Sequence, residues 1–367
     1  MSVGDAYSAS GVDYNALDEF KRFAQSQASS TAPALHAFGM NEVGGCRGES
    51  AYLIELPDRY LAFVEEGLGT KNLVADAMEA LMGKTYYDAI AQDTIAAIVN
   101  DLITSGAQPF VIAMHCAAGS SEWMNNRARW TALVNGWKAA CDAAGATWGP
   151  GETPALNGMV EASTVVLSGS AIGQIAPKTN RIAGNVKEGD EIILVESSGI
   201  HANGLTLART LIERQPEGYL TRLPDGRSMG EALLRPGHLY STLLGTILNN
   251  GIVPHYCVHI TGHGWRKLMR LDPPLTYHID SLPPVLPEFV ALQKWGNLSD
   301  EEMYGTFNMG VGFALYVAAE QAEETIAIAK QVGFSAWRSG RIQTSPTKQV
   351  VIEPKNIVYT GATLKVR

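Results

Sequence analysis

The sequence is poor in the features that mark secreted, membrane-bound and nucleic-acid-binding proteins. Its four cysteines in 367 residues lie far apart and form no C-x-x-C pair, which favours unpaired thiols in a reducing compartment. No apolar run reaches the roughly 18 residues of a membrane span, and the first residues lack the basic and apolar regions of a signal peptide. The net charge of −9 gives no general attraction to nucleic acid or to an anionic membrane. We therefore expect a cytoplasmic protein.

The composition is that of a globular protein with more than one core. Hydrophobic residues make up 46% of the chain and charged residues 18%, which provides ample apolar material. A chain of 367 residues is too long for one ordinary core and predicts about two domains. Turn residues between positions 177 and 189 place the boundary near 176, which gives predicted domains 1–175 and 176–367.

Helix-like and strand-like patterns interleave along both halves of the chain. In the first half they predict helices 14–27, 86–105 and 126–145, and strands 51–56, 60–65, 110–114 and 160–175. In the second half they predict strands 191–196, 252–260, 310–317 and 350–353, a helix at 203–214 and another in the 320s. Because these elements lack strict strand–helix–strand alternation, we expect an α+β fold with two mixed domains.

Residues 65–71, Glu-Glu-Gly-Leu-Gly-Thr-Lys, give the strongest local indication of a ligand site. They follow an apolar run rich in strand formers. Glycines let the backbone approach a ligand closely, and successive turn N–H groups can bind an anion. The charge of Lys71 suits a phosphate, and carboxylates suit Mg²⁺ carried with that phosphate. The pattern predicts a phosphate site, with a charged hairpin turn as the alternative.

Further carboxylates fall on the predicted helix 86–105. Seven residues turn a helix by about 700°, so Asp93 and Asn100 share a face and Asp101 lies about 80° round from Asp93. We expect these side chains beside the 65–71 loop, with a solvated helix face as the alternative. Glu152 in the predicted turn 149–154 would be another oxygen ligand for Mg²⁺.

The second half adds polar loops. Serines and a glycine at 197–204 join a predicted strand to a helix and are typical of an anion site at a helix N-terminus. His201 could donate to phosphate or move protons, while a capping loop with Asn203 as N-cap is the alternative. Residues 261–264 are typical of a ligand-facing loop. Without a finger or H-E-x-x-H pattern, a zinc site remains a minor alternative for His255, Cys257, His259 and His263.

In their order along the chain, these segments resemble the phosphoribosylformylglycinamidine cyclo-ligase family, also called aminoimidazole ribonucleotide synthetases. The resemblance runs from about residue 7 to 353. The residues that carry it are Tyr7, Gly11-Val12-Asp13, Gly67-Leu68-Gly69-Thr70-Lys71, Asp93, Asn100-Asp101-Leu102, Gly106-Ala107-Gln108-Pro109, Gly151-Glu152-Thr153, Ser198-Gly199-Ile200-His201-Ala202-Asn203-Gly204, His259-Ile260-Thr261-Gly262, Glu302-Met303-Tyr304, Thr306-Phe307-Asn308 and Gly310-Val311-Gly312.

The resemblance implies a homodimer whose N-terminal sheets pair across the interface. It also implies an ATP-dependent ligase of purine biosynthesis. The enzyme would activate the formyl oxygen of formylglycinamidine ribonucleotide as an iminophosphate, and the substrate's own amine would then close the imidazole ring. The implied nucleotide-binding residues are Gly67, Gly69, Thr70, Lys71, Gly151, Thr153, Thr261 and Gly262. The implied Mg²⁺ ligands are Glu66, Asp93, Asp101 and Glu152, and the implied catalytic residues are His201, Asn203 and Asn100.

Several positions depart from the family pattern. Glu65-Glu66 stands where Thr-Asp is usual, His263 stands at a glycine position, Gly305 at an arginine and Met309 at a cysteine. Losing that arginine removes a bidentate partner for an anion. Two alternatives therefore stay open: a phosphotransferase of the same superfamily acting on another small molecule, and a non-catalytic nucleotide-binding paralogue.

Overall fold

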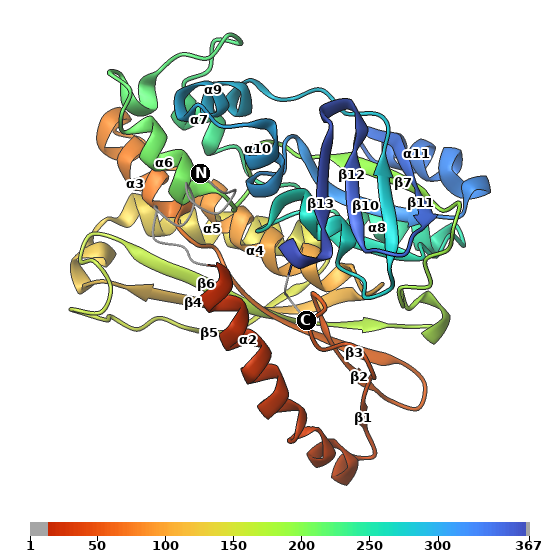
Figure 1. Ribbon diagram of the computed structural model, residues 1–367. Helices are drawn as coiled ribbons and strands as arrows, with labels where there is room; N and C mark the ends of the chain where they lie inside the picture. Colours follow the sequence, from red (N-terminus) through yellow and green to blue (C-terminus); the bar gives the residue numbers. More distant parts are fainter. Residues whose placement is uncertain (1–13, 365–367) are drawn as a thin grey trace.

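The computed structural model describes residues 14–364 of the chain. The expected motif residues at positions 7–13 lie outside the described residues. Two sheets, each with its own helices, divide the chain into an N-terminal and a C-terminal half, and Figure 1 shows the two halves packed against each other. The expected α+β class is confirmed.

The N-terminal half is built on a six-stranded sheet. Its strands, in spatial order, are β1 (Asn41–Glu42), β2 (Tyr52–Glu55), β3 (Tyr60–Gly67), β6 (Val165–Ile175), β4 (Gln108–Ala118) and β5 (Thr147–Glu152). All neighbours pair antiparallel except β4 and β5, which are parallel. Burial alternates along β3 and β6, so one face of the sheet is covered and the other is open.

Three helices, α3 (Lys71–Met82), α4 (Tyr87–Ile103) and α5 (Arg127–Ala144), cover the inner face of this sheet (Figure 1). The central helix α4 packs on β3, β6 and α5. Its apolar residues are buried, and so are its polar ones, with Asp93 at 1%, Asn100 at 0% and Asp101 at 6% exposure. The alternative of a solvated polar face is therefore wrong.

The C-terminal half contains a seven-stranded sheet. Its strands, in spatial order, are β13 (Ile357–Thr360), β12 (Gln349–Ile352), β9 (Leu275–Ile279), β11 (Ala336–Thr344), β7 (Glu191–Glu196), β10 (Val311–Val317) and β8 (Tyr256–His259). Its helices are α6 (Leu205–Ile212), α7 (Met229–Leu233), α8 (Ser241–Asn249), α9 (Pro287–Gly296), α10 (Asp300–Thr306) and α11 (Ala322–Gln331). The first sheet ends at Ile175 and the second begins at Glu191.

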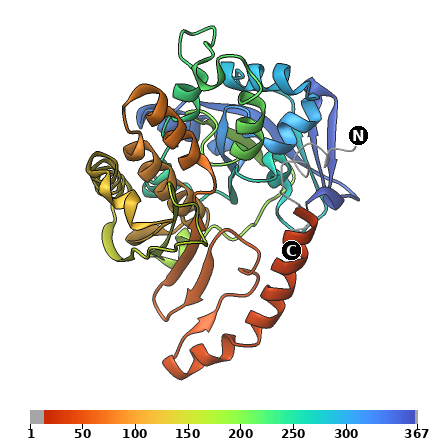
Figure 2. The same cartoon turned by 90° about the vertical axis from the view of Figure 1, so that its left-hand side faces the viewer.

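Helix α2 (Tyr14–Ser29) lies outside the two sheets, with Asp18 buried at 4% exposure and 3.6 Å from His263 of the C-terminal half. Figures 1 and 2 show it projecting from the body together with the β1–β3 region. Phe20 and Phe23 on this helix are 70% and 66% exposed. No helix within the described range 14–364 has the length and apolarity needed to cross a bilayer.

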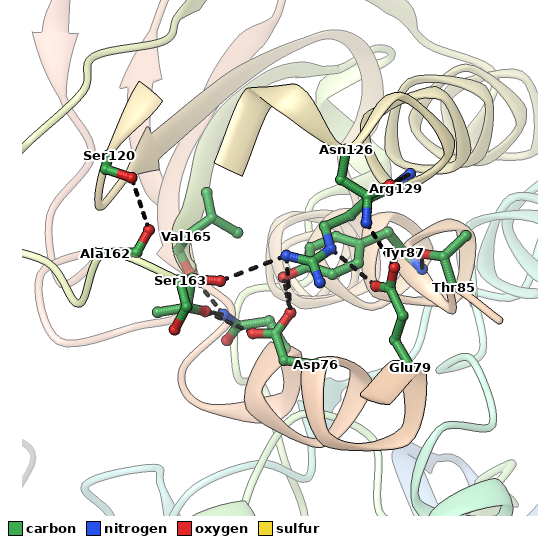
Figure 3. A network of polar contacts seen from close by, with 12 residues as sticks. Asp76, Glu79, Thr85, Tyr87, Ser120, Asn126, Arg129, Ala162, Ser163 and Val165 are labelled. Carbon is green, nitrogen blue, oxygen red and sulfur yellow. Dashed lines mark hydrogen bonds and ion pairs between the residues drawn. The ribbon is translucent and has the colours of Figure 1, made fainter. Parts of the chain in front are cut away.

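A polar network fastens the helices of the N-terminal half (Figure 3). At its centre the Arg129 guanidinium donates from Nε to Glu79 at 2.9 Å and lies 3.7 Å from Asp76. Asp76 also accepts hydrogen bonds from Tyr87 and Thr164. These contacts tie α3, α4 and α5 to the segment that leads into β6.

The predicted elements occur within a few residues of their expected bounds, with three corrections. Residues 147–152 form the edge strand β5, not part of a turn, because they pair with β4. Residues 160–164 are not strand, so β6 starts later than expected. The helix α3 that follows the glycine turn, the helices α7 to α10 and the strands β1, β9, β11 and β13 were not predicted.

Candidate active site between the two halves

A pocket of about 360 Å³ opens where the two halves meet. Glu66 and Asp101 line it from the N-terminal half, and α2 contributes Lys21. The C-terminal half contributes Asn203, Thr261, Gly262, His263, Lys267 and Arg270. Five of the expected site residues thus share one cavity: Glu66, Asp101, Asn203, Thr261 and Gly262.

Glu66 reaches this pocket because of the strand pleat. It lies on the same face of β3 as the buried Ala62 and Val64, so it points toward the helices. Its side chain is exposed to the pocket, but the surrounding protein atoms limit the hydration of the carboxylate. This desolvation, together with the nearby Asp101 carboxylate, raises the pKa of Glu66 to about 7. Glu66 can therefore exchange a proton near neutral pH.

Asp101 is held by a buried histidine. Nδ1 of His259 lies 2.7 Å from Oδ1 of Asp101. Burial alone would raise the pKa of Asp101, but the Lys267 charge and the His259 hydrogen bond outweigh it and lower the pKa. Burial lowers the pKa of His259. The pair is thus an ionised Asp101 carboxylate that accepts a hydrogen bond from the Nδ1–H of a neutral His259 imidazole, and this contact sets the tautomer of the ring.

The glycine turn at 67–70 brings two predicted segments together. It carries the chain from β3 into α3, with Gly69 in the left-handed region at φ 77°. A Cβ at Gly69 would lie 3.8 Å from the carbonyl oxygen of Ala202. The hydroxyls of Thr70 and Thr206 are 3.3 Å apart. The turn therefore packs against the loop that carries His201 and Asn203.

Lys71 lies behind this turn in a buried ion pair. Its ammonium is 2.7 Å from Oδ2 of Asp93, with side-chain exposures of 0% and 1%. It also donates to the carbonyl oxygen of Arg235 at 2.9 Å. Burial lowers the pKa of Lys71 and raises the pKa of Asp93 to about 6, against the mutual attraction of the pair. Neither residue lines the pocket.

The segment 235–240 of the C-terminal half is hydrogen-bonded to the polar side chains of α4. Oδ1 of Asp93 accepts from the Gly237 amide at 2.8 Å. The Asn100 amide group donates to the His238 carbonyl at 2.8 Å and accepts from the Tyr240 amide at 3.0 Å. As their helical spacing predicts, Asp93 and Asn100 share a face, and that face binds the backbone of this segment.

His201 packs against the same segment, with its ring beside those of His238 and Tyr240. It adopts a left-handed conformation at φ 57°, which is uncommon for a residue with a side chain. Its Nε2 accepts from the Ser198 amide at 3.2 Å. Burial holds the pKa of His201 well below its usual range. The imidazole is therefore neutral, and its Nε2 is engaged by the backbone.

The segment 149–154 lies elsewhere. The strand register places Gly67, Ser168, His115 and Glu152 in one row across the sheet. At about 4.8 Å per strand, the Glu152 backbone is about 14 Å from Gly67. Gly151, Glu152 and Thr153 are exposed on the edge strand and its extension. The structure does not bring them to the pocket.

A guanidinium occupies the space beside Gly305. A Cβ at this position would lie 3.4 Å from an amino nitrogen of Arg266, which donates to the Gly305 carbonyl oxygen. Arg266 comes from the 3₁₀ helix η5 (Gly264–Met269), which follows the 261–264 loop. A larger side chain at Gly305 would displace it.

Sequence reasoning missed two parts of this site. The cations Lys267 and Arg270 lie six and nine residues beyond Thr261, and a basic run directly after a glycine loop was the available signal. The segment 235–240 carries no such signal, because it contributes backbone groups.

Comparisons with known proteins agree over most of the chain. The family described as AIR synthase related protein, N-terminal domain, matches residues 48–175, and the corresponding C-terminal domain matches residues 187–353. A phosphoribosylformylglycinamidine cyclo-ligase from Methanocaldococcus jannaschii is 35% identical over 296 residues, covering 80% of this chain and 81% of that protein. The chain belongs to the phosphoribosylformylglycinamidine cyclo-ligase family. A member from Enterococcus faecalis is 34% identical over 356 residues, covering 95% of this chain and 98% of its own.

Solved structures share the fold at lower identity. Thiamine-monophosphate kinase from Stenotrophomonas maltophilia has a TM-score of 0.58 at 20% identity and covers 86% of this chain and 92% of its own. Hydrogenase maturation protein HypE in complex with ATP has a TM-score of 0.58 at 16% identity, covering 84% and 87%. The protein is thus an enzyme of the cyclo-ligase family, with a fold also found in a kinase.

Proposed function

We propose that the enzyme uses ATP to convert formylglycinamidine ribonucleotide to aminoimidazole ribonucleotide in the cytoplasm. The observation that carries this proposal is the 35% identity to a cyclo-ligase over 80% of the chain. ATP would phosphorylate the formyl oxygen to give an iminophosphate. The substrate's amine would then attack the activated carbon, close the ring and release phosphate.

The pocket provides groups suited to this chemistry. Phosphoryl transfer depends mainly on positioning and on neutralising charge, which glycine-rich backbone and cationic side chains supply. We assign ligand contacts to Glu66, Asp101, Asn203, Thr261 and Gly262. The buried residues Lys71, Asp93, Asn100 and His201 would position the walls of the pocket through the segment 235–240. Gly67, Gly69 and Thr70 would allow close backbone approach to the nucleotide.

The donor set fits Mg²⁺ that arrives with a nucleotide. Within residues 14–364 the structure has no cluster of three or more His, Cys, Asp or Glu side chains suited to a metal ion. Mg²⁺ bound through substrate phosphates needs only one or two carboxylates, which Glu66 and Asp101 would provide. Asp93 is neutralised by Lys71, and Glu152 lies on the edge strand. When bound, the ion would offset the charge of the phosphates.

A homodimer would cover the open face of the six-stranded sheet. This face carries large apolar side chains on the central strands, with exposures of 42% for Phe63, 49% for Val166 and 37% for Ile172. Phe63 and Ile172 lie directly opposite each other on β3 and β6. Apolar residues gathered on one open face are typical of a protein interface.

The proposal is tested with purified protein, Mg-ATP and formylglycinamidine ribonucleotide. ADP and the aminoimidazole product are followed together. Formation of both in equal amounts supports the cyclo-ligase activity. Production of ADP only when a different acceptor is supplied would replace it with a phosphotransferase activity, and nucleotide binding without turnover would indicate a non-catalytic protein.

One observation favours the phosphotransferase as a second candidate. The position that is arginine in the family pattern is Gly305, and the guanidinium beside it, from Arg266, donates to the backbone carbonyls of His263 and Gly305. A substrate group that needs that arginine would lose its partner. Screening small-molecule acceptors for ATP-dependent phosphorylation would identify such an activity.

A further inference from the structure

The pocket between the two halves contains three cationic side chains in different states. Lys21 on α2 is 52% exposed and lies 4.0 Å from Asp18. Arg270 is bound into the wall, since it donates to the Gly48 carbonyl and the Ser50 hydroxyl and lies 3.8 Å from Glu49. Lys21 is therefore not held in place by the pocket, and Arg270 already uses its donors within the protein.

Lys267 is the third cationic side chain of the pocket. It extends from η5 into the pocket, where its ammonium donates to the Thr261 hydroxyl. Among the described residues, no carboxylate lies within ion-pair distance of this ammonium, although Asp101 and Glu66 line the same pocket. An ammonium group has three donors, so two remain beyond the contact with Thr261.

The surrounding charges show what this ammonium could bind. Asp101 is already engaged by His259. Glu66 and Lys267 line the same cavity and, among the described residues, form no ion pair with each other, so the pocket presents both a carboxylate and an ammonium to a ligand. A phosphoryl group can bridge such a pair, since its oxygens accept from an ammonium and share Mg²⁺ with carboxylates.

We propose that Lys267, not Lys71, is the lysine that contacts the phosphoryl group of a ligand in this pocket. The inference rests on the phosphate chemistry of the proposed function. Lys71 is fully buried, and its donors are directed at Asp93 and at the Arg235 carbonyl. Lys267 also comes from the C-terminal half, so a phosphoryl group that it binds would contact both halves together with Glu66.

The experiment measures binding by calorimetry, without turnover. The probes are the Mg²⁺ complex of β,γ-methylene-ATP and, separately, ribose 5-phosphate, so that a nucleotide phosphate is distinguished from a sugar phosphate. The test variant is Lys267→Met, which keeps the length of the side chain and removes its charge. Lys267→Arg keeps the charge. The matched control is Lys138→Met on the surface of α5, where Lys138 is 71% exposed.

We expect Lys267→Met to weaken binding of at least one probe by tenfold or more. Lys267→Arg should restore that affinity to within about threefold, and Lys138→Met should leave it unchanged. Thermal unfolding of all three variants within a few degrees of the unmodified protein shows that they are folded. Unchanged affinity for both probes in Lys267→Met would overturn the inference. Failure of the unmodified protein to bind the nucleotide analogue, with ribose 5-phosphate binding still dependent on Lys267, would overturn the ATP-dependent function alone.

Discussion

Replacing Lys71 with methionine should reveal the buried ion pair as a determinant of stability. The variant Lys71→Met leaves the Asp93 carboxylate without its cation and the Arg235 carbonyl without its donor. Removing one partner of a buried pair typically costs about 3–5 kcal/mol, because the other charge stays in a medium that solvates it poorly. We expect a loss of that size in the free energy of unfolding at pH 7.

The loss should depend on pH in a defined way. The pKa of Asp93 is raised to about 6 in the folded protein, so at pH 7 its carboxyl is mostly ionised and is stabilised by Lys71. In Lys71→Met the same carboxyl must remain protonated to stay buried. Below about pH 6 Asp93 is protonated in both folded proteins, so the loss changes only over the pH unit between 7 and 6. One pH unit corresponds to about 1.4 kcal/mol, and the loss should therefore shrink by about that amount between pH 7 and pH 5.

The assay is urea unfolding followed by tryptophan fluorescence, which the seven tryptophans allow. The double variant Lys71→Met/Asp93→Asn carries no charge at the site and keeps an oxygen for the Gly237 amide. It should recover at least half of the lost free energy. A loss below about 1 kcal/mol for Lys71→Met at pH 7, or a double variant no more stable than the single one, would refute this reasoning.

Three further predictions follow from the fold. Burial lowers the pKa of His263 to about 3 in the folded protein from an ordinary 6.5. As the pH falls below 6.5, His263 therefore becomes protonated in the unfolded chain but not in the folded protein, which loses stability. His263→Gly should remove about 2 kcal/mol of this loss at pH 5, and parallel pH profiles of the two proteins in thermal unfolding would contradict it. Arg129→Met should lower the free energy of unfolding by about 3 kcal/mol in urea, because it leaves Asp76 and Glu79 without their cation; an effect no larger than that of Lys138→Met would argue against the network. Phe63→Glu should convert the proposed dimer to a monomer in light scattering, and an unchanged mass would show that another surface forms the dimer.

The elements that the sequence predicted well are those with strong periodicity. Helix α4 was placed within two residues at each end, and the shared face of Asp93 and Asn100 followed from helical geometry alone. What that face contacts could not be read in the same way. Its partner is the backbone of residues 235–240, more than a hundred residues away. Because every residue has these backbone groups, the amino-acid types of the segment do not indicate the contact.

The charged residues were harder to assign for a related reason. A lysine after a glycine turn has the same local pattern whether it faces a ligand or an aspartate, and burial decides between the two. Lys71 is fully buried, whereas Lys267 lines the cavity. Glu152 was predicted to be a partner of Glu66 because both carboxylates lie in short glycine-containing segments. The sheet order, which sequence periodicity does not determine, puts two strands between β3 and β5.

The amides of Gly237 and Tyr240 donate to side chains of α4 rather than to their own half of the chain. Their hydrogens can exchange with solvent only when the two halves separate or when α4 unfolds. Hydrogen exchange at these two positions would therefore measure how often the halves part, without a ligand or a label. A substitution in residues 235–240 that disturbs these two hydrogen bonds should alter that opening and so reduce activity. In a screen for inactive variants, this segment would be mistaken for part of the catalytic machinery.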